Sequence, residues 1–377
     1  MQNDKRNKVF IAGSGIVNPL GNSSDEILYN IEHGNRGTFE KHDQSEVSFG
    51  RVKSSNILID NERKKMDRFT AMAIETASQL DFANDDKENM SVFMGTCMGG
   101  IDFAEKEIKV FYDKGARNVS PYLAISMFYS SNVAQIAIFN EIHGQLSLFS
   151  DGAIASASAI CWAFEFIRND MATTVIAGGS EAPTTELGMK AFMDMGILKD
   201  NSIISEGCGL LLLENEETAN RLNKKILGEI VGYGEDWFGK DEKIAENISG
   251  SIVSCLKNSN MSVEDIDAIV LNNDNIFENS EYEFRSIRDL FVNTNAIYLS
   301  MKHLIGYSFG AGLAQEIVLI LACLEKEMMP EAFVLNNKFL SSDKEKLNMR
   351  KNILNILFVN VDIYGKSIAL IVRRQKK

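Results

Sequence analysis

Two segments of this chain carry almost no charge and are rich in small side chains: residues 152–163 and residues 306–323. Each follows a short apolar run typical of a β-strand. A helix of this composition is stable only where protein surrounds it on all sides, because a solvent-facing side requires polar residues. Small side chains also let helices and strands approach each other closely. The two segments therefore predict two buried helices inside a layered fold, and they hint at a duplicated half.

Ten short runs rich in Val, Ile and Phe are predicted to be strands: residues 8–13, 91–95, 146–150, 173–177, 209–213, 228–232, 268–272, 296–299, 355–361 and 367–372. Helical periods lie between them, and in residues 66–80 the apolar side chains fall on one face of such a helix. This alternation favours an α/β fold. No Pro- or Ser-rich linker interrupts the chain, so we expect one compact unit with an N-terminal half over residues 1–225 and a C-terminal half over residues 226–377.

The charge balance excludes several kinds of partner. The 377 residues include 39 Lys and Arg against 52 Asp and Glu, and the resulting net charge of −13 argues against binding to nucleic acid. The longest uninterrupted apolar stretch, residues 317–324, is far shorter than the roughly 20 residues that a membrane-spanning helix needs. The N-terminal residues lack the pattern of a secretory signal. We therefore expect a soluble, cytoplasmic protein with no membrane partner.

Cysteine occurs five times, always in apolar surroundings and without metal-binding spacing: Cys97, Cys161, Cys208, Cys255 and Cys323. We predict that all five are reduced core residues. The glycines within residues 95–100 and 178–179 do not have the spacing of a phosphate-binding loop. No cofactor and no metal is expected.

Eight short segments together carry a likeness to a known family: residues 9–21, 66–69, 95–100, 119–122, 176–183, 206–209, 263–267 and 302–306. Their order and spacing resembles that of the β-ketoacyl-acyl-carrier-protein synthases, the condensing enzymes of fatty acid and type II polyketide assembly. The resemblance covers nearly the whole chain. It implies a thiolase-like fold in which two similar βαβαβαββ halves form five α-β-α-β-α layers. It also implies dimers that meet across a strand and a helix near residues 130–160.

Active members of that family use a cysteine at the N-terminus of a buried helix together with two histidines. An ungapped alignment puts Ala153 at the cysteine, while Asn272 and Tyr307 take the places of the histidines. Lys302 matches a lysine that the family retains. An alanine cannot form a thioester, and an asparagine cannot shuttle a proton near neutral pH. The histidines of the chain fall at none of these positions: His33, His42, His143 and His303. The resemblance therefore implies a degenerate site with no catalytic residue.

Other positions bear on the acyl cavity of the family. Asp362 stands where active members carry a gating phenylalanine beside the cysteine. Five residues fall where the family lines its acyl tunnel or contributes to the partner's tunnel across the dimer interface: Met98, Phe111, Leu123, Met127 and Phe128. Cys97 is a weak replacement nucleophile, because no histidine is near it in the motif.

The resemblance favours one function over two others. In type II polyketide systems an active ketosynthase pairs with a degenerate homologue, the chain-length factor, and the chain fits that description. As a heterodimer subunit it would shape the tunnel, and an acyl carrier protein would dock mainly on the active partner, because carrier proteins are acidic as well. One alternative is a decarboxylating or acyl-transfer enzyme that uses Asn272 and Tyr307 as hydrogen-bond donors. Another is a homodimeric scaffold that binds carrier protein.

Overall fold

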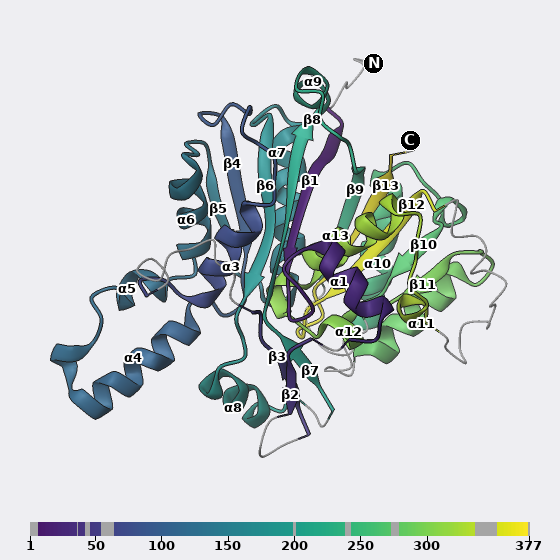
Figure 1. Ribbon diagram of the computed structural model, residues 1–377. Helices are drawn as coiled ribbons and strands as arrows, with labels where there is room; N and C mark the ends of the chain where they lie inside the picture. Colours follow the sequence, from purple (N-terminus) through teal and green to yellow (C-terminus); the bar gives the residue numbers. More distant parts are fainter. Residues whose placement is uncertain are drawn as a thin grey trace.

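The computed structural model describes residues 7–35, 37–41, 46–53, 64–198, 201–237, 243–272, 279–335 and 353–375. Its main feature is a ten-stranded sheet (Figure 1). The strands are β1 (Val9–Val17), β4 (Met90–Gly95), β5 (Leu146–Phe149), β6 (Thr174–Glu181), β8 (Gly207–Asn215), β9 (Gly228–Asp236), β10 (Ala268–Val270), β11 (Ile297–Leu299), β12 (Asn355–Val361) and β13 (Ser367–Arg374). Each of the ten predicted runs coincides with one of them, so the strand prediction is confirmed.

The order of the strands repeats. Outward from the central antiparallel pair β1–β9, one side runs β1-β8-β6-β4-β5 and the other runs β9-β13-β12-β10-β11. If the five strands of each side are numbered by their order in the chain, both sides run from the centre outward as first, fifth, fourth, second and third strand. The directions match as well, because the two inner pairings on each side are antiparallel and the two outer ones are parallel. The duplication at which the two apolar segments hinted is therefore present in the topology.

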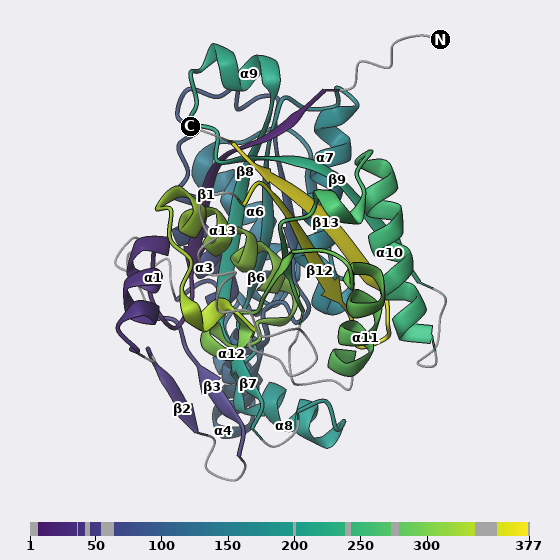
Figure 2. The same ribbon diagram turned by 90° about the vertical axis from the view of Figure 1, so that its right-hand side faces the viewer.

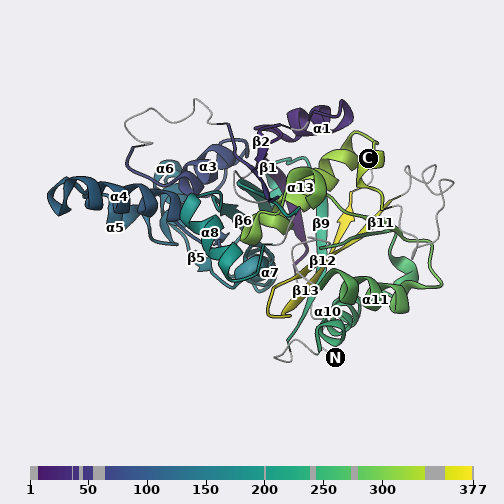
Figure 3. The same cartoon turned by 90° about the horizontal axis from the view of Figure 1, so that it is seen from below.

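The two predicted buried helices lie at the centre of the molecule. They are α7 (Ala155–Arg168) and α13 (Gly312–Glu325), and each begins with a 3₁₀ turn, η2 (Gly152–Ile154) and η5 (Phe309–Ala311). The two helices contact each other as well as the sheet. Outside the sheet, α3 (Arg68–Ala77) and α6 (Ser131–Asn140) cover one half, while α10 (Ile244–Asn258) and α11 (Asn279–Phe291) cover the other (Figure 3). This is the five-layer arrangement of the thiolase-like fold.

Two smaller parts were not predicted. A three-stranded sheet joins β2 (Phe39–Lys41), β3 (Ser48–Gly50) and β7 (Ile203–Ser205), and α8 (Glu186–Asp194) lies beside it (Figures 1 and 2). Strands of three residues are too short to show an alternating pattern. The second part is an arm made of α4 (Ile101–Lys114), η1 (Ala116–Asn118) and α5 (Leu123–Ser126), which projects from the body (Figure 1).

Short helices complete the described chain: α1 (Ser24–Glu32), α9 (Glu216–Arg221), α12 (Lys302–Ile305), η4 (Val263–Asp265) and η6 (Glu331–Phe333). The predicted helix over residues 66–80 is α3, which is shorter because the Asp67 side chain accepts the Phe69 N–H at 3.0 Å and caps the helix. Four of the cysteines are buried and Cys97 is half-buried, and all five are free thiols. Among the described residues, every helix is too short or too polar to cross a membrane.

Candidate functional site

The start of helix α7 is where the resemblance expects a nucleophile. Gly152 opens the turn with φ +73°, a backbone conformation that favours glycine, and Ala153 follows with 3% of its surface exposed. The Ala153 N–H donates to Asp362 Oδ1 at 2.9 Å. Asp362 comes directly after β12, so a residue 209 positions away in the chain closes this helix end. Burial raises the pKa of Asp362, and the backbone N–H groups of Ala153 and Tyr364 oppose that shift.

A buried polar network surrounds Asn272, which lies two residues beyond β10. Lys302, the first residue of α12, donates from Nζ to the Asn272 carbonyl at 2.9 Å and to Oδ1 at 3.0 Å. Asn360 Nδ2 donates to the same Oδ1 at 2.8 Å. Glu316 of α13 balances the buried ammonium, with 3.1 Å between Lys302 Nζ and Glu316 Oε1. The amide oxygen of Asn272 thus accepts two hydrogen bonds, and its orientation is held on both sides.

Aromatic rings fill the region next to Ala153. Tyr307 is only 1% exposed, and its ring lies 5.9 Å from Lys302 Nζ. Its centroid is 4.9 Å from that of Phe309, which in turn stacks on Phe192 at 4.7 Å. Ala153, Tyr307 and Phe309 belong to one apolar cluster. The structure therefore brings Ala153, Lys302 and Tyr307 together, with Asn272 bound to the same lysine.

The chemistry of this arrangement is limited. Ala153 offers no nucleophile, and the one thiol in the cluster belongs to Cys97. Burial raises the pKa of Cys97 far above its ordinary value, and the nearby carboxylates of Glu181 and Asp362 raise it further. A thiol with such a pKa remains protonated and unreactive near neutral pH. The surroundings of Cys97 thus agree with the prediction that it is a weak nucleophile.

The histidines of the described chain have other surroundings. His33 caps α1 and stacks on Tyr29, while His143 lies 4.0 Å from Glu88 in the loop before β5. His303 follows Lys302, and burial lowers its pKa. His42 lies outside the described residues.

The five predicted tunnel and interface residues lie on the arm and at its base. Met98 and Leu123 are half-buried, whereas Phe111, Met127 and Phe128 are exposed by 48%, 44% and 62%. The arm begins beside α3, because Asp67 Oδ2 accepts the Phe103 N–H at 2.6 Å. Within this subunit the three exposed side chains line no interior space.

The exposed apolar surface extends beyond the three predicted residues Phe111, Met127 and Phe128. It continues along the arm and onto α6, β5 and α7 through Ile108, Tyr112, Ile125, Tyr129, Ile138, Phe139, Leu146 and Trp162. The sequence of α4 indicates part of this surface, because Ile108, Phe111 and Tyr112 are spaced so that they lie on one side of the helix. We call this set, together with Phe111, Met127 and Phe128, the apolar face.

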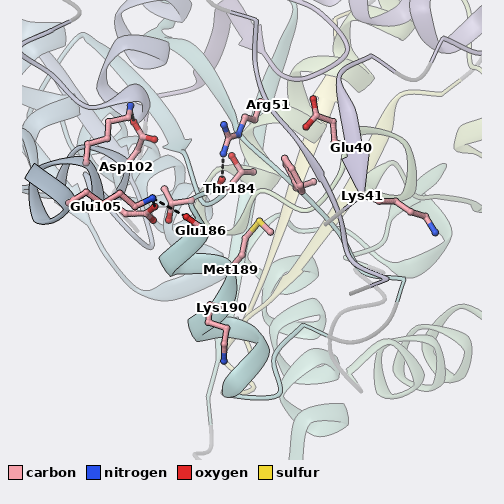
Figure 4. Close-up of a pocket in the computed structure, with 13 residues that line it drawn as sticks. Glu40, Lys41, Arg51, Asp102, Glu105, Thr184, Glu186, Met189 and Lys190 are labelled. Atoms are coloured by element: carbon pink, nitrogen blue, oxygen red, sulfur yellow. Dashed lines mark hydrogen bonds and ion pairs between the residues drawn. The ribbon is translucent and has the colours of Figure 1, made fainter. Parts of the chain in front are cut away.

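A surface pocket of about 560 Å³ lies between the small sheet, α4 and α8 (Figure 4). Its charges largely pair with one another or with the backbone. Lys109 lies 3.1 Å from Glu105 and 2.9 Å from Glu186, and Arg51 donates to the Thr184 carbonyl at 2.8 Å. No local pattern in the sequence predicts this pocket, because its residues come from three segments far apart in the chain.

Comparison with known proteins gives consistent results. Residues 6–219 match the family model described as "Beta-ketoacyl synthase, N-terminal domain". The 3-oxoacyl-[acyl-carrier-protein] synthase 2 of Synechocystis sp. is 26% identical, and the alignment covers 89% of this chain and 90% of that protein. The synthase of the same name from Staphylococcus aureus is 28% identical over 62% of this chain and 63% of its own length.

Solved structures share the fold at low identity. The ishigamide ketosynthase/chain length factor matches with a TM-score of 0.84 at 17% identity, covering 98% of this chain and 100% of that one. A chain from the complex of a type II polyketide synthase acyl-carrier protein with its hexaketide-bound ketosynthase matches with a TM-score of 0.83 at 20% identity. The match covers 99% of this chain and 100% of that one. The ketosynthase of Xenorhabdus doucetiae in complex with its chain length factor matches at 0.80 and 17%, covering 98% of both chains.

Proposed function

The chain belongs to the β-ketoacyl synthase family, and from this premise we propose that it is a noncatalytic subunit that pairs with an active ketosynthase and shapes the tunnel in which a polyketide chain grows. In this role it corresponds to a chain-length factor. The observation that carries the proposal is Ala153 at the start of buried helix α7, hydrogen-bonded to Asp362. A methyl side chain cannot accept an acyl group, so covalent catalysis has to take place on another subunit.

The rings around Ala153 support the same conclusion. Tyr307 and Phe309 are 1% and 3% exposed, and they occupy space next to the helix start that a bound acyl chain would need. We propose that Asn272 and Tyr307 stand in the places of the two family histidines and that Lys302 is the retained lysine. With Asn272 Oδ1 engaged by Lys302 and Asn360, this network holds the fold together instead of moving protons.

The apolar face supports a protein partner. Soluble monomers seldom expose so many large apolar side chains in one region. β5, at one end of the ten-stranded order, adds an outer strand available for pairing. We propose that the active ketosynthase covers this face and that Phe111, Met127 and Phe128 then reach toward the growing chain. Met98 and Leu123, at the base of the arm, would contribute from behind.

Carrier protein is proposed to dock mainly on the active partner. This chain has a net charge of −13, and acyl carrier proteins are acidic, so the two surfaces repel each other on average. Two of the solved neighbours are ketosynthases with their chain length factors, which supports pairing, and a third is a complex with a carrier protein.

Co-expression with an active ketosynthase from the same genomic neighbourhood tests the pairing. We expect a stable one-to-one complex by size-exclusion chromatography with light scattering. Ile138→Asp on the apolar face should abolish the complex, because it buries a charge at the interface. Val253→Asp on α10 is the matched control, since Val253 is similarly exposed at 52% but lies on the other half. A persistent homodimer, or equal loss in both variants, would favour the scaffold function instead.

The product of the complex tests the tunnel role. Phe128→Ala and Met127→Ala enlarge the space next to the partner, so we expect longer polyketide products by mass spectrometry. Unchanged product length in both variants would remove these residues from the tunnel. Incubation of the chain alone with malonyl-carrier protein separates the enzymatic alternative: carbon dioxide release above that of a boiled sample would show decarboxylation and refute a noncatalytic subunit.

A further inference from the structure

The two buried helices begin in the same way. Helix α7 follows the turn η2, whose first residue, Gly152, has φ +73°, and helix α13 follows the turn η5, whose first residue, Phe309, has φ +42°. In each turn the second residue, Ala153 or Gly310, presents its backbone N–H at the N-terminal end of a long helix. Such an end carries partial positive charge and unsatisfied N–H groups, so it attracts an anion.

In both places a carboxyl group from the other half meets this helix end. Glu181, the last residue of β6, accepts the Gly310 N–H at the start of α13. Asp362, directly after β12, accepts the Ala153 N–H at the start of α7. β6 and β12 are the fourth strands of their halves and occupy equivalent positions in the sheet. The two carboxylates are thus related by the duplication, and each half closes the buried helix of the other.

Space at the α7 end is already taken. A side-chain carbon placed on Gly152 would overlap with Asp362 Oδ1. Ionisable groups near Asp362 include Asp151 and Cys97, and Lys366 lies 3.5 Å from Asp151. The Asp362 carboxylate accepts the backbone N–H groups of Ala153 at 2.9 Å and of Tyr364 at 3.2 Å.

We propose that the Asp362 carboxylate permanently occupies the anion-accepting end of helix α7 and keeps a thiolate or an acyl oxyanion out of it. The site is then blocked twice, once by the methyl group of Ala153 and once by this internal carboxylate. The proposal goes beyond the proposed function, because it concerns this subunit alone and holds with or without a partner.

The ionisation of a thiol introduced at position 153 tests whether the Asp362 carboxylate occupies the helix end. In Ala153→Cys the new thiol lies beside the carboxylate, which raises its pKa and removes the help of the helix end. In the double variant Ala153→Cys/Asp362→Asn the negative charge is gone while the shape is kept. We expect about tenfold more thiolate near neutral pH in the double variant, from the ultraviolet absorbance of thiolate during a pH titration. The titration of the protein that keeps Ala153 but carries the same carboxyl substitution is subtracted in each case, because Asp362 and Glu181 also act on Cys97; this removes the five native cysteines.

The matched control is Ala153→Cys/Glu181→Gln, which replaces the equivalent carboxyl group at the other helix by a neutral amide. It should increase the thiolate fraction much less than Asp362→Asn does. Equal effects of the two neutralisations, or a thiol in Ala153→Cys that already ionises below its ordinary pKa, would overturn the proposal. None of these measurements depends on a ketosynthase partner. A negative result here therefore leaves the pairing proposal intact, and a negative pairing result leaves this proposal intact.

A second measurement covers the case in which the double variant does not fold. In the unaltered protein, the NMR chemical shift of the Ala153 amide should titrate with one inflection above the ordinary range of an aspartate, because its hydrogen-bond acceptor changes charge. The amide of Gly310 should respond in the same way to Glu181. An Ala153 shift that stays constant through the titration of Asp362 would overturn the proposal.

Discussion

The two halves of this protein share their strand order and their buried helices, but they differ in how those helices start. At α13, Phe309 supplies the turn and Glu181 gathers the N–H groups of Gly310, Cys97 and Met98. At α7, Gly152 supplies the turn and Asp362 binds a single N–H of the helix. The first helix start is tied to the largely buried segment after β4 and packed by larger side chains, whereas the other two bonds of Asp362 come from its own turn, from Ile363 and Tyr364. The second has small residues, Gly152 and Ala153, at the proposed position of the family's reactive site, and the Asp362 carboxylate accepts its N–H.

Replacing Phe309 gives the largest expected effect. Phe309→Ala removes a ring packed between Phe192 and Tyr307, and we expect a loss of about 4 kcal/mol in the free energy of unfolding. Phe309→Gly should be about 1 kcal/mol more stable than Phe309→Ala, because φ +42° strains any residue with a side chain. Denaturant unfolding measures both variants. The opposite order, which is usual inside helices, would show that the turn is unstrained and would weaken the likeness to Gly152.

Removing the carboxylates tests the difference in bonding. Glu181→Ala leaves several buried N–H groups without their acceptor, and we expect a loss of about 3 kcal/mol in unfolding free energy. Asp362→Ala removes one bond to the helix and two within its own turn, where the half-buried Ile363 and the exposed Tyr364 leave room for water as acceptor, so it should cost only about 1 kcal/mol. Denaturant unfolding of the two variants side by side gives the ratio. A larger loss for Asp362→Ala would reverse the assignment of the α13 start as the more stable one.

A methyl group on Gly152 tests the crowding at α7. Gly152→Ala combines an unfavourable φ with a contact on Asp362 Oδ1, and we expect a loss of about 2 kcal/mol. Gly34→Ala is the matched control, because Gly34 has a similar φ of +68° and open space around it. It should lose only about 1 kcal/mol. Equal losses in thermal unfolding would mean that Asp362 leaves room at the helix start.

The pH dependence of stability is the most gradual effect, because it accumulates over several pH units. Burial raises the pKa of Glu181 to about 8, against an unfolded value of 4.5. Between these values the folded chain holds a proton that the unfolded chain has lost, so the stability from Glu181 is present at low pH and falls as pH rises toward about 8. The stability of the unaltered protein relative to Glu181→Gln should therefore decline by up to about 1.4 kcal/mol per pH unit in this window. A relative stability that rises with pH would contradict the raised pKa.

Two other buried carboxyl groups also contribute stability that falls as pH rises. Burial raises the pKa of Asp67 and of Glu214 to about 7, and for Glu214 the charge of Asp85 adds to the shift. These groups are present in both the unaltered protein and Glu181→Gln, so the comparison of the two cancels them.

The fold could be predicted in large part from local pattern. All ten strands of the main sheet and both buried helices follow from apolar runs and from the lack of charge, because burial on two faces leaves a residue pattern that a short window shows. The three-stranded sheet could not be predicted in this way. Its strands have three residues each, and β7 comes from a segment about 150 residues beyond β3.

The sequence by itself determined that Ala153 lies at the start of a nearly uncharged helix and that the chain resembles a condensing enzyme. Only the tertiary structure decided what meets that helix. Asp362 reaches Ala153 because the sheet brings the end of β12 next to the start of α7, and Lys302 reaches Asn272 and Glu316 through a similar convergence. Periodicity reports whether a residue is buried, but the partner of a buried polar group depends on strand order and register, which no local window contains.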